Sequence, residues 1–230
     1  MAILICNDPG HGGTDPGAQG NGLQEKTVVL EIALKANERL KAHGFQTIMT
    51  RTDDTFIGLS ERADMANRAH ANYFISYHLN AGGGSGFESY VMDGYDNGET
   101  GRIRSVIHSR VAEYFVSNGL PDRGKKQADF AVLRETVMPA VLLELGFIDN
   151  GADAEKLKDA VFKSGLVEAI VRGVCEAFGV PYVPPTPPYL GYRVIEDGVQ
   201  TGTYREHNNI LAAIDRALSR GVSEIIVRKV

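Results

Sequence analysis

A proline-rich segment near residue 180 constrains the fold of this chain more than any other feature. Residues 179–188 read GVPYVPPTPP, with five prolines in ten positions. Proline lacks a backbone N–H and fixes φ, so this segment continues neither a helix nor a central strand. It is typical of a stiff, extended spacer. We therefore expect two folded domains, residues 1–179 and 189–230, joined by a linker over residues 180–188.

The first domain alternates apolar strands with amphipathic helices. We expect strands at residues 2–6, 45–50, 73–77, 87–92 and 140–145, and helices at residues 26–43, 59–70, 99–118 and 166–178. Residues 140–145 are almost continuously apolar, as in a central strand covered on both faces. This alternation predicts an α/β fold of three layers, with a sheet between helices.

The second domain is short and has a β-α-β pattern. We expect a strand at residues 189–195, a helix at 206–220 and a strand at 224–230. A unit of this size buries little core alone. We therefore expect it to dock on the first domain or to pair with a second copy of the chain in a homodimer.

Composition excludes several kinds of partner. The net charge is −5 and there is no basic block, so we expect no nucleic-acid binding. No apolar run approaches ~20 residues, so we expect no membrane span. Residues 1–6 lack the basic leader and cleavage site of a signal peptide, which predicts a cytoplasmic protein unless another agent releases it. Cys6 and Cys175 are interpreted as two buried free thiols.

Two histidines and a glutamate lie where predicted strands end or helices begin. His11 is in a glycine-rich loop after the first strand, Glu25 starts the first long helix, and His78 ends the strand at residues 73–77. Open α/β sheets place their sites at such positions. Two imidazoles and one carboxylate hold Zn²⁺ while leaving a position for water. This pattern predicts a hydrolytic zinc site.

Glu144 ends the central apolar strand expected at residues 140–145 and supplies a further carboxylate. Burial there is costly without a charge partner, and it raises the carboxyl pKa toward the range of a general base. Taken singly, each residue also has a structural interpretation. A loop histidine is commonly only hydrogen-bonded, Glu25 suits a helix N-terminus, and Glu144 suits a buried salt bridge. The compact His-Glu-x-x-His motif is absent.

Other polar residues are interpreted as structural. The remaining histidines fall on predicted helices among charged residues and are expected at the surface: His43, His70, His108 and His207. Arg51 and Arg62 are expected to form ion pairs with nearby acidic residues (Asp53, Asp54 or Asp64), more often than to bind substrate. Glu88 lies near the same segments.

A series of short motifs runs in order through the first 178 residues. They are DPGHGG at 8–13, DPGA at 15–18, EK at 25–26, TR at 50–51, SYHLNA at 76–81 and PAVLLELGFIDN at 139–150. Together they resemble the zinc-dependent N-acetylmuramoyl-L-alanine amidases of the amidase-3 family. The resemblance implies a mixed six-stranded sheet flanked by helices. It also implies hydrolysis of the amide that joins the lactyl group of N-acetylmuramic acid to L-alanine in peptidoglycan.

The resemblance assigns a role to each candidate residue. His11, Glu25 and His78 match the ligands of one Zn²⁺ ion, and Glu144 matches the catalytic glutamate, which takes a proton from water and passes it to the departing amine. Asn80 lies two residues beyond His78. It is interpreted either as a substrate contact or as a residue that shapes its own loop.

The C-terminal domain contains YRV at 192–194, GVQTGTY at 198–204 and NN at 208–209, followed by a helix at 212–218 and a final strand at 225–227. Together these segments resemble one half of a SPOR-type peptidoglycan-binding domain, whose complete form has two β-α-β halves. Pairing of two chains would restore that form, and a small stabilising tail is the alternative. The preferred interpretation of the whole chain is a wall-lytic amidase of the phage endolysin type, released with a holin, with a bacterial mother-cell autolysin as the second. Two further alternatives are a zinc peptidase or deacetylase, and a wall-binding module that has lost catalysis. The presence of Glu144 and of all three candidate ligands argues against the module without catalysis.

Overall fold

The computed structural model describes residues 3–185, 192–204 and 207–229, and it divides the chain into two compact units, Met1–Val183 and Pro184–Val230. The first unit includes the start of the segment predicted as a linker. Tyr182 donates its hydroxyl hydrogen to Glu168 Oε2 at 2.7 Å, and the backbone N–H of Val183 donates to His43 Nε2 at 3.0 Å. The first unit therefore extends to Val183.

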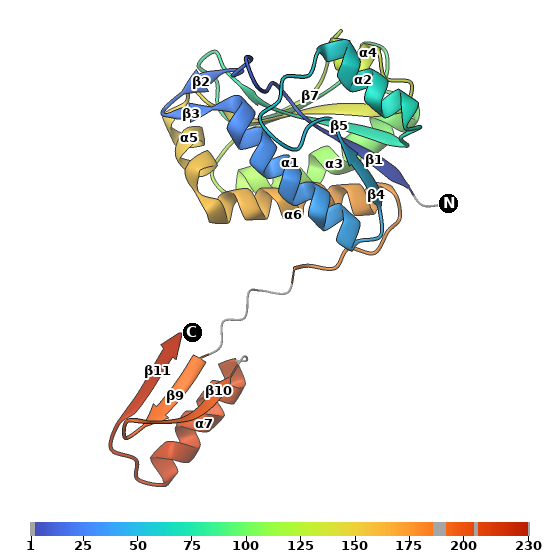
Figure 1. Cartoon of the computed structure of the whole chain (residues 1–230). Coiled ribbons are helices and arrows are strands. Elements are labelled where there is room, and N and C mark those ends of the chain that lie inside the picture. Colours follow the sequence, from blue (N-terminus) through green and yellow to red (C-terminus); the bar gives the residue numbers. More distant parts are fainter. Residues whose placement is uncertain (1–2, 186–191, 205–206, 230) are drawn as a thin grey trace. The chain divides into compact units, whose positions relative to one another are not determined.

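A six-stranded mixed sheet forms the centre of the first unit (Figure 1). Its strands, in spatial order, are β4 (Gln46–Met49), β1 (Leu4–Pro9), β5 (Tyr73–Asn80), β8 (Ala140–Phe147), β6 (Phe87–Val91) and β7 (Asp122–Gln127). The first four are parallel to one another, β6 is antiparallel to β8, and β7 is parallel to β6. This sheet confirms the predicted α/β fold.

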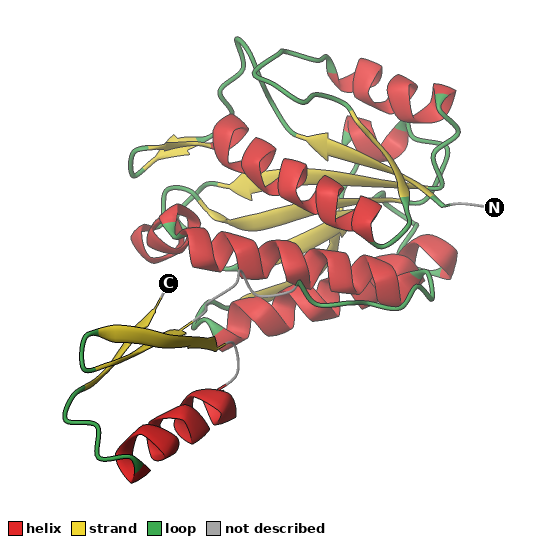
Figure 2. Ribbon diagram, turned by 60° about the horizontal axis from the view of Figure 1, so that its bottom comes forward, coloured by secondary structure: helices red, strands yellow, loops and turns green. Residues whose placement is uncertain are grey.

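Helices cover both faces of the sheet (Figure 2). The helices α1 (Glu25–Ala42), α3 (Gly98–Ser117) and α6 (Ala160–Ala177) share one apolar core with the sheet, to which α5 (Gly151–Lys158) adds Leu157. The shorter α2 (Leu59–Arg68) and α4 (Ala131–Arg134) share a smaller core with the opposite face. The three predicted layers are therefore present.

Strand alternation decides which face carries the chemistry. Ile75 and Tyr77 of β5 pack in the core beneath α1, α3 and α6, whereas Phe74 packs in the core beneath α2 and α4. His78 has the same parity as Phe74, so it faces the α2 and α4 side. Glu144 of β8 is its register partner and faces the same way.

Several elements differ from the sequence-based expectations. Strands β5 and β8 run on past His78 and Glu144, so both residues lie inside strands instead of at their ends. The strand β7, the short hairpin β2 (Gln19–Gly20) and β3 (Leu23–Gln24), and the helices α4 and α5 were not predicted. Their sequences are short or almost wholly polar, as in DRGKKQ of β7, so they carry no apolar periodicity.

The second unit contains β9 (Tyr192–Glu196), β10 (Val199–Tyr204), α7 (His207–Ser219) and β11 (Ile225–Lys229). They form an antiparallel sheet of order β10-β9-β11, and Val194, Ile210 and Ala213 make the small core. The predicted β-α-β pattern lacked β10. A turn in which Asp197 and Gly198 both have positive φ links β9 to β10.

Two further observations concern the cysteines and the helices. Cys6 and Cys175 are buried free thiols, as predicted. Within the described parts of the chain, no helix combines the length and the apolar content that crossing a bilayer requires.

Candidate active site

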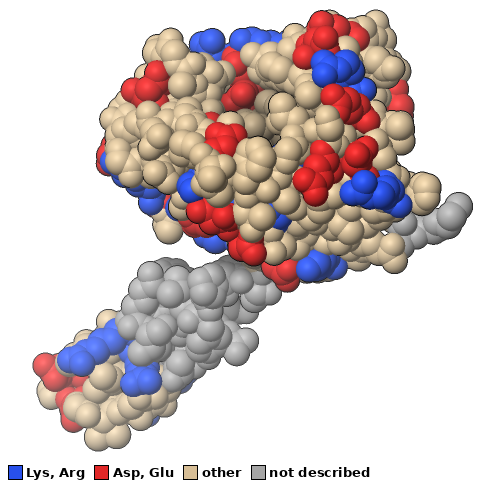
Figure 3. All heavy atoms as spheres, turned by 45° about the horizontal axis from the view of Figure 1, so that its top comes forward, with Lys and Arg blue, Asp and Glu red and all other residues tan. Residues whose placement is uncertain are grey.

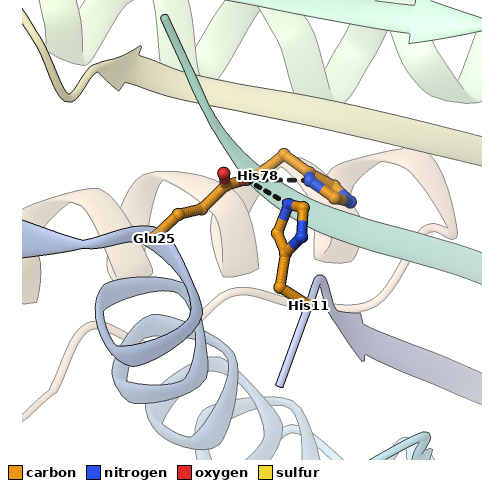
Figure 4. Close-up of side chains that lie close together, drawn as sticks. All are labelled: His11, Glu25 and His78. Carbon is orange, nitrogen blue, oxygen red and sulfur yellow. Dashed lines mark hydrogen bonds and ion pairs between the residues drawn. The ribbon is translucent and has the colours of Figure 1, made fainter. Parts of the chain in front are cut away.

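Three side chains from separate elements converge at one end of the sheet (Figure 4). His11 comes from the loop after β1, Glu25 is the first residue of α1, and His78 belongs to β5. Glu25 Oε1 lies 3.0 Å from His11 Nε2 and 2.9 Å from His78 Nδ1. One donor atom from each residue lies within 4.8 Å of the others, so the three form a candidate metal site.

Glycine makes this close approach possible. A Cβ atom on Gly10 would lie 2.3 Å from Cε1 of His78, and one on Gly17 would lie 2.6 Å from Oε2 of Glu25. Gly17 also has φ near +66°, in the left-handed region where side chains are disfavoured. The glycine-rich loop thus leaves room for the imidazole and the carboxylate.

Hydrogen bonds orient the imidazole of His11 and the loop that carries it. Asp15 Oδ2 lies 2.8 Å from His11 Nδ1, which leaves Nε2 facing Glu25. The guanidinium of Arg62 donates to the backbone oxygen of His11 at 2.7 Å and to Asp8 Oδ1 at 2.8 Å. Asp8 and Arg62 are both buried, so the loop that carries His11 is tied to the interior of the sheet.

Glu25 is held as a carboxylate. Its Oε2 accepts a hydrogen bond from the backbone N–H of Ala18 at 2.8 Å, and its Oε1 accepts one from that of Leu79 at 2.9 Å. Burial opposes ionisation, but hydrogen bonds with His11 and His78 outweigh it and keep the pKa of Glu25 well below its usual range. An ionised carboxylate beside two imidazoles is a donor set suited to a divalent transition metal.

Glu144 lies beside this group on the adjacent strand and has the opposite electrostatic character. Its Oε2 is shielded from solvent and makes no hydrogen bond with the described residues. Burial raises the pKa of Glu144 to about 7; His78 acts against this rise, and the negative charges of Glu25 and Glu88 add to it. A carboxyl group with this pKa can both accept and donate a proton near neutral pH.

Asn80 and Glu88 form the next part of the site. Asn80 Nδ2 donates to Glu88 Oε1 at 2.6 Å, and Asn80 Oδ1 accepts from the backbone N–H of Ala81 at 2.8 Å. Both polar ends of Asn80 therefore have protein partners, which agrees with the interpretation that it shapes its loop.

The other polar residues singled out from the sequence have different surroundings from those expected. Arg51 donates to the backbone oxygens of Pro9, Gly10, Lys26 and Asp53, so it meets Asp53 through the main chain and not as an ion pair. Arg62 pairs with Asp8 instead of a neighbouring acidic residue. His108 was expected at the surface, but it is buried between α3 and the sheet. That expectation was wrong because His108 sits one position from Ile107 on the buried face of α3.

A cleft of about 370 Å³ opens at the histidine side of the site. His11 and His78 line it together with apolar side chains from the segment before α2 and its first turn, namely Phe56, Ile57 and Leu59. Figure 3, which brings the top of the Figure 1 view forward, shows a hollow in the surface of the first unit. Acidic side chains lie beside this hollow. The candidate metal site is therefore accessible to a substrate.

Metal-dependent hydrolases combine three protein donors with a nearby group that moves protons, and the fold and site define a protein of that class. The chain belongs to the Amidase_3 family of N-acetylmuramoyl-L-alanine amidases, whose sequence profile matches residues 5–176. This is a zinc-dependent family. The reaction is hydrolysis of the amide between the lactyl group of N-acetylmuramic acid and L-alanine in peptidoglycan, as the sequence motifs implied.

Individual relatives agree with this assignment. The chain is 40% identical over 229 residues to the sporulation-specific N-acetylmuramoyl-L-alanine amidase of Bacillus subtilis, covering 99% of this chain and 85% of the relative. It is 41% identical over 179 residues to the endolysin of Bacillus phage SPP1, covering 76% and 66%. The crystal structure of an amidase from Clostridium difficile 630 superposes with a TM-score of 0.73 at 33% identity, covering 77% of this chain and 97% of that one.

Proposed function

We propose that His11, Glu25 and His78 hold a single Zn²⁺ ion and that Glu144 is the proton-transfer residue. The donor set supports zinc: two imidazole nitrogens and one ionised carboxylate oxygen gather around a small volume, and hydrogen bonds orient His11 and Glu25. When bound, the ion lowers the pKa of water and polarises the amide carbonyl.

The protein groups then have distinct tasks. Glu144 accepts a proton from the attacking water and donates it to the leaving amine of L-alanine. Asp15 and the backbone N–H of Leu79 keep His11 and Glu25 in place. The observation that carries this proposal is the shielded Oε2 of Glu144, which has no protein partner among the described residues and lies on the strand beside His78.

Substitution of Glu144 by Gln tests the assignment. The Glu144→Gln variant is expected to bind zinc with unchanged stoichiometry and to lose roughly 10²- to 10⁴-fold in turnover, the range that general acid–base catalysis contributes. Zinc content is measured by metal analysis, and turnover by release of L-alanine amino groups from purified walls. Glu25→Gln is the matched variant and is expected to lose zinc itself. Retention of most activity by Glu144→Gln would reject the role of Glu144.

We further propose that the chain acts as a bacterial autolysin of the sporulation type. The sporulation-specific relative aligns over nearly the whole chain, including the second unit, whereas the phage endolysin aligns over about three quarters of it. This favours the mother-cell autolysin over the phage enzyme preferred from sequence, with action on the wall after release. The proposal is tested in the source cell with a transcriptional reporter for the gene of this chain. Induction of the reporter during sporulation supports the proposal, and induction only together with prophage genes contradicts it.

We also propose that the second unit binds peptidoglycan, as the resemblance to half of a SPOR-type domain suggests. It lies beyond residue 176, where the family match ends, and it has its own small core. A chain that ends at Val183 is expected to keep its activity on soluble muropeptides and to bind insoluble walls less well in a sedimentation assay. Equal sedimentation of both chains would contradict this role. Gel filtration of the full chain tests the accompanying homodimer, and a strict monomer would exclude it.

A further inference from the structure

Glu144 belongs to a row of titratable and charged residues that crosses four neighbouring strands. Its register partner on β5 is His78, and its register partner on β6 is Glu88. On the far side of β6 lies the edge strand β7, which contributes Arg123 and Lys126. The row thus leads from the candidate metal site to two cations at the edge of the sheet.

Glu88 anchors both cations. Its side chain is 2% exposed, and Oε2 lies 2.8 Å from Arg123 Nε and also contacts Lys126 Nζ. Its Oε1 accepts hydrogen bonds from Asn80 Nδ2 and from the hydroxyl of Tyr90. One carboxylate therefore meets two positive charges, and the group of Glu88, Arg123 and Lys126 carries a net charge of +1.

The two cations remain available to a ligand. The Arg123 and Lys126 side chains are 36% and 35% exposed. Arg123 bonds Glu88 through Nε, and its two terminal nitrogens make no hydrogen bond with the described residues. Its guanidinium also lies over the ring of Phe147 at 4.7 Å, which fixes its plane. A guanidinium held in this way is preorganised to bind a carboxylate with its free N–H groups.

The spacing matches the substrate. Neighbouring strands lie about 4.8 Å apart, so β7 lies roughly 10 Å from β8 and from Glu144. An extended peptide advances about 3.3 Å per residue. Counted from the scissile amide, the second residue of the stem peptide therefore reaches roughly 7 Å, and its side groups reach farther. The lining of the apolar cleft beside Phe56 and Ile57 includes neither Arg123 nor Lys126, so the cationic group is a separate surface that attracts the acidic stem peptide.

We propose that Arg123 and Lys126 bind the free α-carboxylate of the second stem-peptide residue, a D-glutamate joined through its γ-carboxyl group. They make the enzyme prefer this acidic form over the form in which the same carboxylate is an amide. Glu88 is a positioning residue that holds the two cations, and Asn80 buttresses it. The proposal concerns specificity within the amidase reaction and leaves the chemistry at Glu144 unchanged.

Two substrates that differ in one group test the proposal. They are MurNAc-L-Ala-γ-D-Glu-L-Lys and the analogue with D-isoglutamine at the second position. The wild-type chain is expected to cleave the acidic substrate with a kcat/KM about tenfold higher, in line with a charge-assisted hydrogen bond. Arg123→Gln and Lys126→Gln are each expected to bring this ratio toward one.

Lys125→Gln is the matched control, because Lys125 lies between the two cations in sequence but bonds Ser105 of α3 on the opposite face. It is expected to keep the wild-type ratio. Partial misfolding lowers the rate on both substrates equally, so a merely structural role leaves the ratio unchanged. A wild-type ratio near one, or a ratio that survives both substitutions, would overturn the proposal.

Discussion

Gly10 packs against the imidazole of His78 with no room for a side chain: a Cβ atom would lie 2.3 Å from His78 Cε1 and 2.5 Å from Nε2. The Gly10→Ala variant must therefore push His78 out of its position. We expect it to lose most activity and to bind zinc at least about tenfold more weakly, since small displacements at metal sites have effects of that size. Chelator competition measures the affinity.

Gly151→Ala is the control for this substitution. Gly151 begins α5, and a Cβ there meets no atom of the described residues within 4 Å. Alanine suits a helix better than glycine, so this variant should keep its zinc and be equally or slightly more stable. Normal zinc affinity in Gly10→Ala would show that the loop can relax around the added methyl group.

Asp15 controls the orientation of His11 through the 2.8 Å contact with Nδ1. The Asp15→Asn variant keeps the shape of the side chain but removes the charge that favours an N–H at Nδ1 and a free Nε2. We expect zinc affinity to fall about 10- to 100-fold, as for other carboxylate–histidine–metal contacts. Asp64→Asn, on the exposed side of α2, is the control. Equal zinc affinities for these two variants would argue against an orienting role for Asp15.

The buried pair of Arg62 and Asp8 ties the loop of His11 to the sheet. Asp8 also accepts hydrogen bonds from Thr50 and Ser76, so removal of Arg62 leaves a buried carboxylate without its counter-charge. We expect Arg62→Met to lower the free energy of unfolding by about 3–5 kcal/mol. Urea denaturation measures this change.

Arg68 provides the comparison on the same helix. It pairs with Asp64 at 3.8 Å, with both side chains more than 60% exposed. Such surface pairs contribute little, so Arg68→Gln should unfold at nearly the wild-type urea concentration. A similar loss for Arg62→Met and Arg68→Gln would show that the buried pair has no special weight.

The layered fold and the meeting of His11, Glu25 and His78 could be predicted because both follow from local patterns. The alternation of apolar strands and amphipathic helices predicts parallel strands whose carboxyl ends share one edge of the sheet. His11 follows β1, His78 lies in β5 two positions before its end, and Glu25 begins the connecting helix. Their proximity is then a consequence of topology.

Contacts without a local pattern could not be predicted. Arg62 and Asp8 are 54 positions apart, and nothing near either residue indicates the other. Strand β7 has the sequence DRGKKQ, whose polar residues suit an edge strand but resemble a loop. Its place beside Glu88, and hence the cluster of Arg123 and Lys126, became visible only with the sheet order. The burial of His108 depended in the same way on which face of α3 meets the sheet.

His108 links three elements of the sheet and its covering helix. Its Nδ1 lies 2.8 Å from Ser89 Oγ of β6, and its Nε2 lies 3.1 Å from Asp122 Oδ1 of β7. Burial lowers the pKa of His108, and the positive charges of Arg104 and Lys125 lower it further. Asp122 raises this pKa and so opposes the shift only in part. The neutral imidazole is therefore the form that the folded protein favours.

This preference predicts a pH dependence of stability. Below the unfolded-state pKa of about 6.5, the unfolded chain binds a proton at His108 more readily than the folded chain does. The contribution of His108 is thus fully present above pH 6.5 and is lost as the pH falls toward the lower pKa of the folded state. Wild-type protein should lose more stability between pH 7.5 and pH 5 than His108→Gln, as measured by urea denaturation.

His70→Asn, at an exposed position whose φ of 53° suits asparagine, controls for removal of a histidine as such. Parallel stability curves for wild type and His108→Gln would show that the folded protein accepts the charged imidazole, because only an unequal proton affinity in the two states makes the curves diverge.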